Sequence, residues 1–342
     1  MSMTFTIDDQ AIADYMAFAE TDYIRDAAYF MDDLKERMLL DRQSYGDPLP
    51  WSKTHEIFRM RPGEVTLWAG INGHMKSMVT SQVMSWMLPE HNVTVASMEM
   101  QPSSSLERMA KMCGCNNWED MRRWLNWASG RLSIYDQLDT VHSDRVLAMV
   151  HAAATIYNSK HIVIDSLMKC MGGVRDNEKN GKQTDFLNAL TRLAKLHNIH
   201  VHLVHHMRKG ESEERIPDKF MVKGAGEITD QIDNLVIVHA NKRKQRVLDS
   251  GDLDAIEEVQ NERDLTLRVA KQRHGEWEGD IKLWFDPASL QHIPNRTGGT
   301  MPWPYPGATI LDHTVTTSQE NSGRPLGENP AGVSEFPETG FH

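Results

Sequence analysis

A segment near residue 70 combines glycine, lysine and serine at a spacing that could bind phosphate. Gly70-Ile-Asn-Gly-His-Met-Lys-Ser77 matches the pattern G-x-x-x-x-G-K-[ST], except that Met75 replaces the last glycine. In such a loop the backbone N–H groups surround a phosphate, the lysine reaches its outer oxygens and the serine hydroxyl binds Mg²⁺. Met75 keeps its N–H but adds a side chain, so its effect on nucleotide affinity is open. The predicted ATP-binding residues are Gly70, Asn72, Gly73, His74, Met75, Lys76, Ser77 and Met78.

Two carboxylates follow apolar runs that are typical of buried strands. Asp165 ends the run that starts at His161, and Glu99 comes directly after the run that starts at Val93. Near a phosphate loop, Asp165 is predicted to hold Mg²⁺ together with Ser77. Glu99 could orient or deprotonate an attacking water molecule, and the alternative is an exposed loop glutamate.

These residues need a sheet that brings the strand ends together. Short apolar runs alternate with helical segments, which indicates an α/β fold with a mostly parallel central sheet flanked by helices and with antiparallel edge strands. The predicted helices cover residues 77–88, 103–125, 141–157 and 184–196. The predicted strands cover residues 65–68, 93–97, 132–135, 161–164, 201–204, 235–239, 265–270 and 281–285.

Segments of different composition flank this body. Residues 1–45 form a predicted helical arm and linker, with an amphipathic helix from Asp22 to about Leu40 and Thr21 as its N-cap. Residues 46–295 form the predicted ATPase domain. Residues 296–342 are rich in Gly, Pro, Ser and Thr and are predicted to be a disordered tail. The arm helix could dock on another subunit or pack on its own domain.

Charge and composition exclude several classes of protein. The net charge of −11 divides into −6 for residues 1–42, −3 for residues 296–342 and −2 for the middle, so the body is close to neutral and DNA binding is not excluded. No apolar stretch is long enough to span a membrane, and no signal peptide is recognisable. Three cysteines do not make a disulfide framework, which favours a cytoplasmic protein.

Together these segments resemble the RecA-like P-loop ATPase domain of DnaB-type replicative DNA helicases, a group that includes phage primase-helicases and the mitochondrial helicase Twinkle. The resemblance covers roughly residues 45–292. Ser97-Met-Glu-Met100 matches the family segment that supplies the catalytic glutamate, and Arg108 follows in a similar Leu-x-Arg-Met context. The resemblance implies that Glu99 is the general base and that Lys76 stabilises the transferred phosphoryl group.

Two later segments of the chain match family elements that act on the γ-phosphate. The strand that starts at Val201 resembles the one that ends in a phosphate-sensing residue; His205 and His206 are both candidates, and His205 is preferred. The four histidines between residues 200 and 206 could also suggest a metal site, but alternation along a strand argues against it. Ala270-Lys-Gln-Arg-His-Gly275 matches a family element that implies Lys271 and Arg273 as an arginine finger supplied to the adjacent subunit.

Two loops of the sequence are the predicted DNA contacts. The segment from Lys223 to Asn234 resembles the family loop that grips the DNA backbone in the central channel, although its residues differ at several positions. Its candidate contacts are Lys223, Gly224, Ala225 and Gly226, whose backbone N–H groups could bind phosphates without reading bases. In a second basic loop, Arg175 and Lys179 could also face the channel, or the loop could simply be solvated.

The resemblance implies a homo-hexameric helicase that moves on single-stranded DNA with ATP and Mg²⁺ and unwinds duplex DNA during replication. No primase pattern precedes the arm, so a separate primase is expected, as is a phage origin with the bacterial host cytoplasm as its location. The tail could dock a primase, polymerase or loader, or could be inert. Alternatives are a RecA- or RadA-type ATPase, a loader, and a degenerate P-loop protein that binds DNA without turnover.

Overall fold

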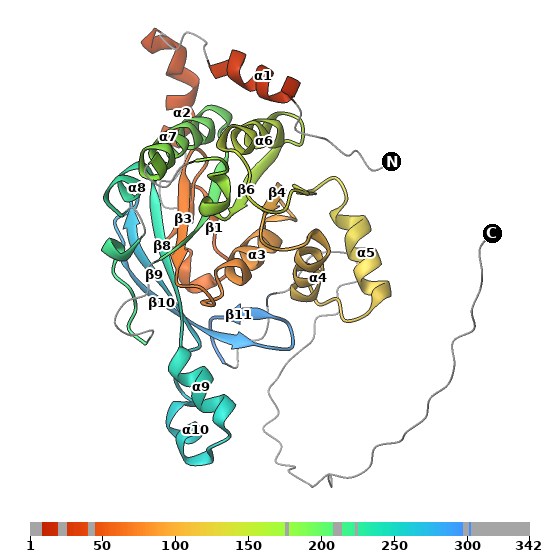
Figure 1. Cartoon of the computed structure of the whole chain (residues 1–342), viewed down its shortest axis with the longest axis vertical. Coiled ribbons are helices and arrows are strands. Elements are labelled where there is room, and N and C mark those ends of the chain that lie inside the picture. Colours follow the sequence, from red (N-terminus) through yellow and green to blue (C-terminus); the bar gives the residue numbers. More distant parts are fainter. Residues whose placement is uncertain are drawn as a thin grey trace, which may run out of the picture.

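A mixed sheet organises the residues that the computed structural model describes, which are 9–19, 26–39, 45–174, 178–207, 214–222, 225–296 and 301. Within them, nine strands lie in the order β11-β10-β9-β8-β3-β7-β6-β4-β5 (Figure 1). The strands from β8 to β5 are parallel, and β9, β10 and β11 are antiparallel. The predicted α/β fold with an antiparallel edge is therefore confirmed.

All eight predicted strands are present, and one further strand closes the edge. A separate two-stranded sheet pairs β1 with β2. The bounds are β1 Asp47–Pro48, β2 Arg59–Met60, β3 Val65–Gly70, β4 Asn92–Ser97, β5 Leu132–Ile134, β6 Ser159–Asp165, β7 His200–His206, β8 Asn234–Ala240, β9 Leu265–Gln272, β10 Gly279–Asp286 and β11 Gln291–Ile293.

Helices cover both faces of the sheet because its strands carry apolar side chains on both sides. On β3, Val65 and Leu67 belong to one buried cluster and Trp68 belongs to the other. The first cluster includes α6 (Ser143–Thr155), α7 (Lys179–His197) and α8 (Ala225–Gln231), and the second includes α3 (Lys76–Met87), α4 (Pro102–Met112) and α5 (Trp118–Ala128). Parallel strands between two helical layers bring their C-terminal ends to one edge of the sheet.

The helix predicted over residues 103–125 is in fact two helices. Helix α4 ends at Met112, Gly114 has a φ of 84°, and α5 begins at Trp118. A glycine with positive φ is a common helix terminator, and the side chain of Asn117 caps α5 by accepting a hydrogen bond from the N–H of Asp120 at 3.0 Å. The amphipathic spacing continues across the break, which is why the sequence predicted one helix.

Three helices outside the sheet were not predicted as such. Helix α1 (Asp9–Ala19) packs on α6, with Tyr15 only 7% exposed. A hairpin of α9 (Lys242–Ser250) and α10 (Leu253–Val259) projects between β8 and β9 (Figure 1). The predicted helix of residues 22–40 is a 3-10 turn, Ala27–Phe30, followed by α2 (Met31–Leu39), and Asp26 rather than Thr21 caps it. Thr21 lies outside the described residues.

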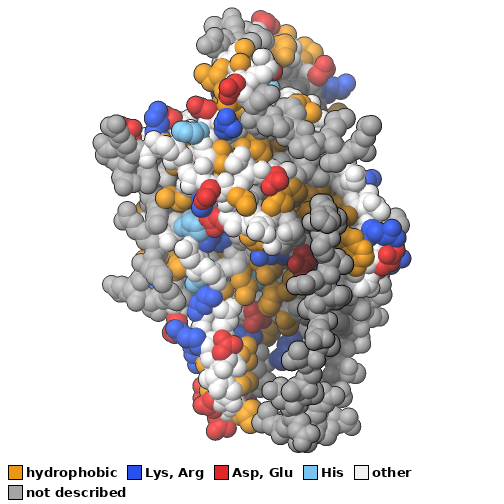
Figure 2. Space-filling view, turned by 45° about the vertical axis from the view of Figure 1, so that its right-hand side comes forward, with side chains coloured by type: hydrophobic (Ala, Val, Ile, Leu, Met, Phe, Trp, Pro, Cys, Tyr) orange, Lys and Arg blue, Asp and Glu red, His pale blue; other side chains and the backbone are white. Residues whose placement is uncertain are grey.

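The described ends of the chain differ in their surroundings. Helix α2 and the turn before it expose Tyr29, Met31, Leu34, Met38 and Leu39, and hydrophobic side chains are visible at this end of the molecule in Figure 2. Met301 is buried, and its N–H donates to Gln291 Oε1 at 2.9 Å, so ordered packing continues past residue 295. Other residues of the predicted tail beyond Arg296 lie outside the described part. No helix in the described residues could cross a membrane.

Candidate functional site

The predicted phosphate loop joins the end of β3 to the start of α3. A Cβ at Gly70 would lie 2.5 Å from the carbonyl oxygen of Val238, so only glycine fits where the loop begins. Gly73 has a φ of 78°, which also favours glycine. Met75 supplies no side-chain cap at the helix start, so the first N–H groups of α3 are free to bind an anion. The predicted residues from Gly70 to Met78 therefore form one loop and helix start.

Met75 adopts the backbone conformation that glycine would adopt in the standard motif. Its φ of 64° and ψ of 21° lie in the left-handed region, which costs a residue with a Cβ about 1–2 kcal/mol. The side chain is partly buried and packs against the cluster that contains Trp68. Because the loop keeps this geometry without the glycine, the substitution leaves the shape of the phosphate cradle intact.

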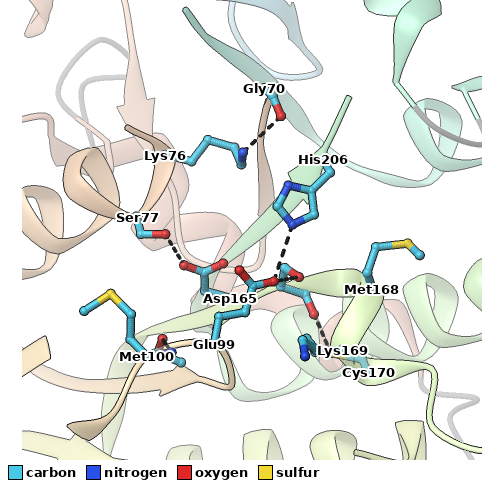
Figure 3. A network of polar contacts seen from close by, with 12 residues as sticks. Gly70, Lys76, Ser77, Glu99, Met100, Asp165, Met168, Lys169, Cys170 and His206 are labelled. Carbon is cyan, nitrogen blue, oxygen red and sulfur yellow. Dashed lines mark hydrogen bonds and ion pairs between the residues drawn. The ribbon is translucent and has the colours of Figure 1, made fainter. Parts of the chain in front are cut away.

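Lys76 is buried at the centre of the loop. Its Nζ donates to the carbonyl oxygens of Gly70 and Ile71, each at 3.0 Å. Burial lowers the pKa of Lys76, and the nearby carboxylates of Asp165 and Glu99 raise it again (Figure 3). An ammonium group that is held only by backbone carbonyls can turn to phosphate oxygens at little cost, because no carboxylate has to be given up.

Ser77 and Asp165 meet where Mg²⁺ was predicted. The hydroxyl of Ser77 donates to Asp165 Oδ2 at 2.5 Å, and Asp165 is only 4% exposed. Burial raises the pKa of Asp165, and the hydrogen bond from Ser77 opposes that shift. Hard oxygen atoms are the ligands that Mg²⁺ prefers. This pair therefore fits the cation, whose charge would stabilise the buried carboxylate.

Glu99 lies beside Asp165, beyond the end of β4. Its Oε1 accepts hydrogen bonds from Ser166 Oγ at 2.9 Å and from His206 Nε2 at 3.4 Å. The hydrogen bond from His206 is the main cause that lowers the pKa of Glu99 to about 2, with burial acting in the opposite direction. The carboxylate is thus ionised but a weak base while both donors hold it. Ser166, which neighbours Asp165 in the sequence, was not predicted as part of the site.

His206, and not His205, reaches this site, so the preference for His205 has to be corrected. Side chains alternate along β7, and His205 is fully buried while His206 points towards Glu99 (Figure 3). Neighbouring histidines looked equivalent in the sequence because the facing of β7 was not known. The strand register decides between them.

Lys271 and Arg273 lie at the opposite edge of the sheet. Strand β9 is antiparallel to β8, so the Lys271–Gln272 end of β9 pairs with the beginning of β8, near Thr66. Gly70 is four residues beyond Thr66, or about 13 Å along the strand. In their own chain, these two cations are therefore far from the phosphate loop.

Both cations hold the end of α8 instead. Lys271 Nζ donates to the carbonyl oxygens of Thr229 and Ile232 at 2.6 and 2.9 Å. Arg273 donates to the carbonyl oxygen of Asp230 at 2.7 Å and lies 3.4 Å from the carboxylate of Asp233. Cations at a helix C-terminus are favourably placed because the last carbonyls carry partial negative charge.

Most of the predicted DNA contacts lie where the structure says little. Lys223, Gly224 and Arg175 are outside the described residues. Ala225 and Gly226 form the first turn of α8, and Lys179 begins α7, but their side chains are not described. Their role in DNA binding stays a prediction.

A second polar cluster, which the sequence did not predict, occupies the edge opposite the phosphate loop. Trp68 Nε1 donates to His202 Nδ1 at 3.2 Å, His202 Nε2 lies 3.1 Å from His161 Nδ1, and His161 Nε2 lies 3.0 Å from Asp47 Oδ2. His91 Nε2 approaches the other oxygen of Asp47 at 2.8 Å. Asp47, His91 and His161 place ligand atoms within 4.8 Å of one another, as a metal site would.

The protons of this cluster argue for a hydrogen-bonded chain. An indole N–H can only donate, so Nδ1 of His202 is an acceptor and its Nε2 carries the proton. That proton is donated to His161 Nδ1, which leaves the proton of His161 on Nε2, where it is donated to Asp47. A metal on His161 Nε2 would need the proton on Nδ1, opposite a donor. Trp68 therefore sets the tautomers in favour of the chain and against a metal.

Comparisons with known proteins agree with this arrangement. A family model described as an AAA domain matches residues 53–212. No curated protein sequence gives a significant match. The fold is similar to a solved helicase ATPase domain, with a TM-score of 0.65 and 14% identity over 80% of this chain and 100% of that chain. It is similar to a DnaB-like replicative helicase studied with primase, with a TM-score of 0.64 and 14% identity over 83% of this chain and 70% of that chain. This chain therefore has a RecA-like P-loop fold, which it shares with the ATPase domains of DnaB-like replicative helicases.

Proposed function

We propose that this chain is the ATPase subunit of a ring helicase that moves along single-stranded DNA and separates duplex DNA during replication. The family model and the fold support an ATPase role. The finer activity, with its ring of six subunits and its DNA track, is our proposal. One observation carries it: hydrolytic groups gather at one edge of the sheet, and a cationic pair lies at the other.

This separation makes a ring the natural assembly. Lys76, Ser77, Asp165 and Glu99 are together, whereas Lys271 and Arg273 are too far away to contact a nucleotide on the same chain. If subunits associate edge to edge, the two cations of one subunit face the phosphate loop of the next. An arginine supplied in this way stabilises the charge of the transferred phosphoryl group.

The arm offers a second contact between subunits. Leu34, Met38 and Leu39 of α2 are between 59% and 78% exposed in the single chain. Burial of such side chains is favourable by roughly 1.5–3 kcal/mol each, so a neighbouring subunit that covers them would be stabilised. Docking in trans is the arrangement that leaves the ATPase edge free.

Hydrolysis would use the residues at the loop edge. Mg²⁺, when bound by Ser77 and Asp165, would neutralise charge on the phosphate oxygens. Lys76 would exchange its two carbonyl partners for phosphate oxygens. Glu99 would accept a proton from water as the water oxygen bonds to the γ-phosphorus and the bond to the ADP oxygen breaks. His206 would release Glu99 when it turns to the γ-phosphate, which would strengthen the base.

Coupling to DNA would run through α8 and β7. Residues 223–226 are the proposed backbone contacts, with Arg175 and Lys179 as further candidates. Lys271 and Arg273 hold carbonyls at the end of α8, so a change at the subunit interface would move this helix. A separate primase, polymerase or loader is the proposed partner, and the cytoplasm, of a bacterial host if the gene is from a phage, is the proposed location.

Steady-state ATP hydrolysis with and without single-stranded DNA tests the proposal. We expect DNA to stimulate hydrolysis by the wild type, and we expect both Glu99→Gln and Arg273→Ala to abolish it. Sedimentation with Mg²⁺ and nucleotide should show a hexamer. A wild type that binds nucleotide but does not hydrolyse it, with or without DNA, would favour a P-loop protein without turnover. Hydrolysis without unwinding would favour a loader or a RecA-type ATPase.

A further inference from the structure

A small cavity borders the Ser77–Asp165 pair. It lies between α3, α4 and the ends of β4 and β6, and its polar lining includes Ser77, Ser81, Ser97, Ser105, Arg108 and Asp165. The space accommodates about one water molecule, which is too little for a phosphate group. The cavity is therefore suited to a bridging water between its polar walls.

Arg108 is the cation of this cavity. It lies on α4, is half-buried, and makes no hydrogen bond or ion pair with another described residue. Its neighbours on the same helix differ, because Glu107 and Lys111 pair with each other at 2.7 Å. Burial lowers the pKa of Arg108, and the negative charge of Asp165 acts in the opposite direction. A half-buried guanidinium without a direct partner usually has a functional or water-mediated one.

Asp165 needs such a partner. Ser77 takes Oδ2, which leaves Oδ1 for another donor. Burial favours the neutral form of this carboxyl, yet only the ionised form can hold the water shell of Mg²⁺. A fixed positive charge across the cavity would favour the ionised form, and Arg keeps its charge at any pH of interest.

We propose that Arg108 is a positioning residue that holds Asp165 ionised and oriented across this cavity through one bridging water. The inference rests on the proposed function, since it assigns a role at the same Mg²⁺ site. It has a consequence that depends on pH. Arg108 also repels Mg²⁺, so its removal weakens Mg²⁺ binding only at the low pH where Asp165 would otherwise become protonated.

The test is the Mg²⁺ concentration needed for binding of a fluorescent ADP analogue, measured at pH 6 and pH 8. Arg108→Gln should need about three to ten times more Mg²⁺ than the wild type at pH 6, as a shift of half a unit to one unit in a pKa would give, and should differ by less than about twofold at pH 8. Arg108→Lys, which keeps the charge, should recover most of the loss. Arg122→Gln is the control, because Arg122 is exposed on α5 and pairs with Glu119.

Two results would overturn the inference. One is an Arg108→Gln variant that matches the wild type at both pH values, and the other is a variant weakened equally at both, which would indicate a packing role. Thermal unfolding of each variant identifies loss of fold, and Arg108→Lys then carries the comparison. If the wild type itself shows no Mg²⁺-dependent nucleotide binding, the proposed function fails first, and this outcome is distinct from either result for Arg108.

Discussion

The two edges of the parallel sheet handle buried polar groups in different ways. At the loop edge, Lys76 is bonded to backbone carbonyls alone and Asp165 to a serine, so buried charges await partners of opposite sign. At the other edge, Trp68, His202, His161 and Asp47 form a chain in which each proton has a donor and an acceptor. Buried charges without full compensation mark a ligand site, whereas a completed chain needs no ligand.

The largest expected effect concerns the cations that belong to the second edge but would serve the first edge of a neighbour. Arg273→Ala should lower the rate of ATP hydrolysis by about 10³–10⁵-fold, as loss of an arginine finger does. The measurement is kcat at saturating ATP and DNA. Arg268→Ala on the same strand is the control; it removes a pair with Asp280 at 2.7 Å and should change kcat by less than about twofold.

Mixing experiments sharpen this prediction. A subunit with Arg273→Ala should regain activity when its neighbour supplies the arginine, so rings of Arg273→Ala with Lys76→Ala subunits should be more active than either variant alone. Full activity of Arg273→Ala by itself would exclude a role in hydrolysis for this edge.

The next effect compares carboxylates at the two edges. Glu99→Gln should lower kcat by roughly 10²–10⁴-fold while nucleotide still binds, because a general base is lost and the phosphate loop is intact. Single-turnover hydrolysis and binding of labelled ADP separate these two quantities. Glu90→Gln, an exposed change near His91, should leave both unchanged. Equal rates for wild type and Glu99→Gln would mean that another group activates the water.

A third prediction uses pH to unbalance the histidine edge. Burial and the nearby His161 lower the pKa of His200 to about 3, below its value of about 6.5 in the unfolded chain. The unfolded state therefore binds a proton more readily, so stability is full above pH 6.5 and is lost as pH falls towards 3. Each such histidine should cost about 1.4 kcal/mol per pH unit within this window.

Urea unfolding at pH 7.5, 6.0 and 5.0 measures that slope. His200→Gln can keep the bond to the carbonyl of Arg61 but cannot titrate, so the slope should fall by one proton. His142→Gln, at an exposed position, is the control and should leave the slope unchanged. An unaltered slope in His200→Gln would show that His200 is protonated in the folded protein or shielded in the unfolded chain.

The smallest expected effect concerns strain in the phosphate loop. Met75→Gly and Met75→Ala both remove the methionine side chain, but only alanine retains a Cβ at a φ of 64°. The glycine variant should therefore be more stable than the alanine variant by about 1 kcal/mol in urea unfolding. Equal stabilities would mean that the loop relaxes around residue 75 when the methionine is absent.

Features that depend on local patterns could be predicted from the sequence alone. Strand and helix alternation indicated the α/β fold, and the spacing from Gly70 to Ser77 located the phosphate loop in spite of Met75, because backbone N–H groups do not depend on the side chain. Asp165 and Glu99 were identifiable because both follow buried strands, whose C-terminal ends share an edge.

Features that depend on register and distance became visible only in the folded chain. Only the facing of β7 separates His206 from His205, and only the antiparallel pairing of β9 puts Arg273 far from the phosphate loop of its own chain. The chain from Trp68 to Asp47 joins residues of four strands that have no common spacing in the sequence. Periodicity describes one element at a time, whereas such contacts arise from the packing of elements that are distant in the chain.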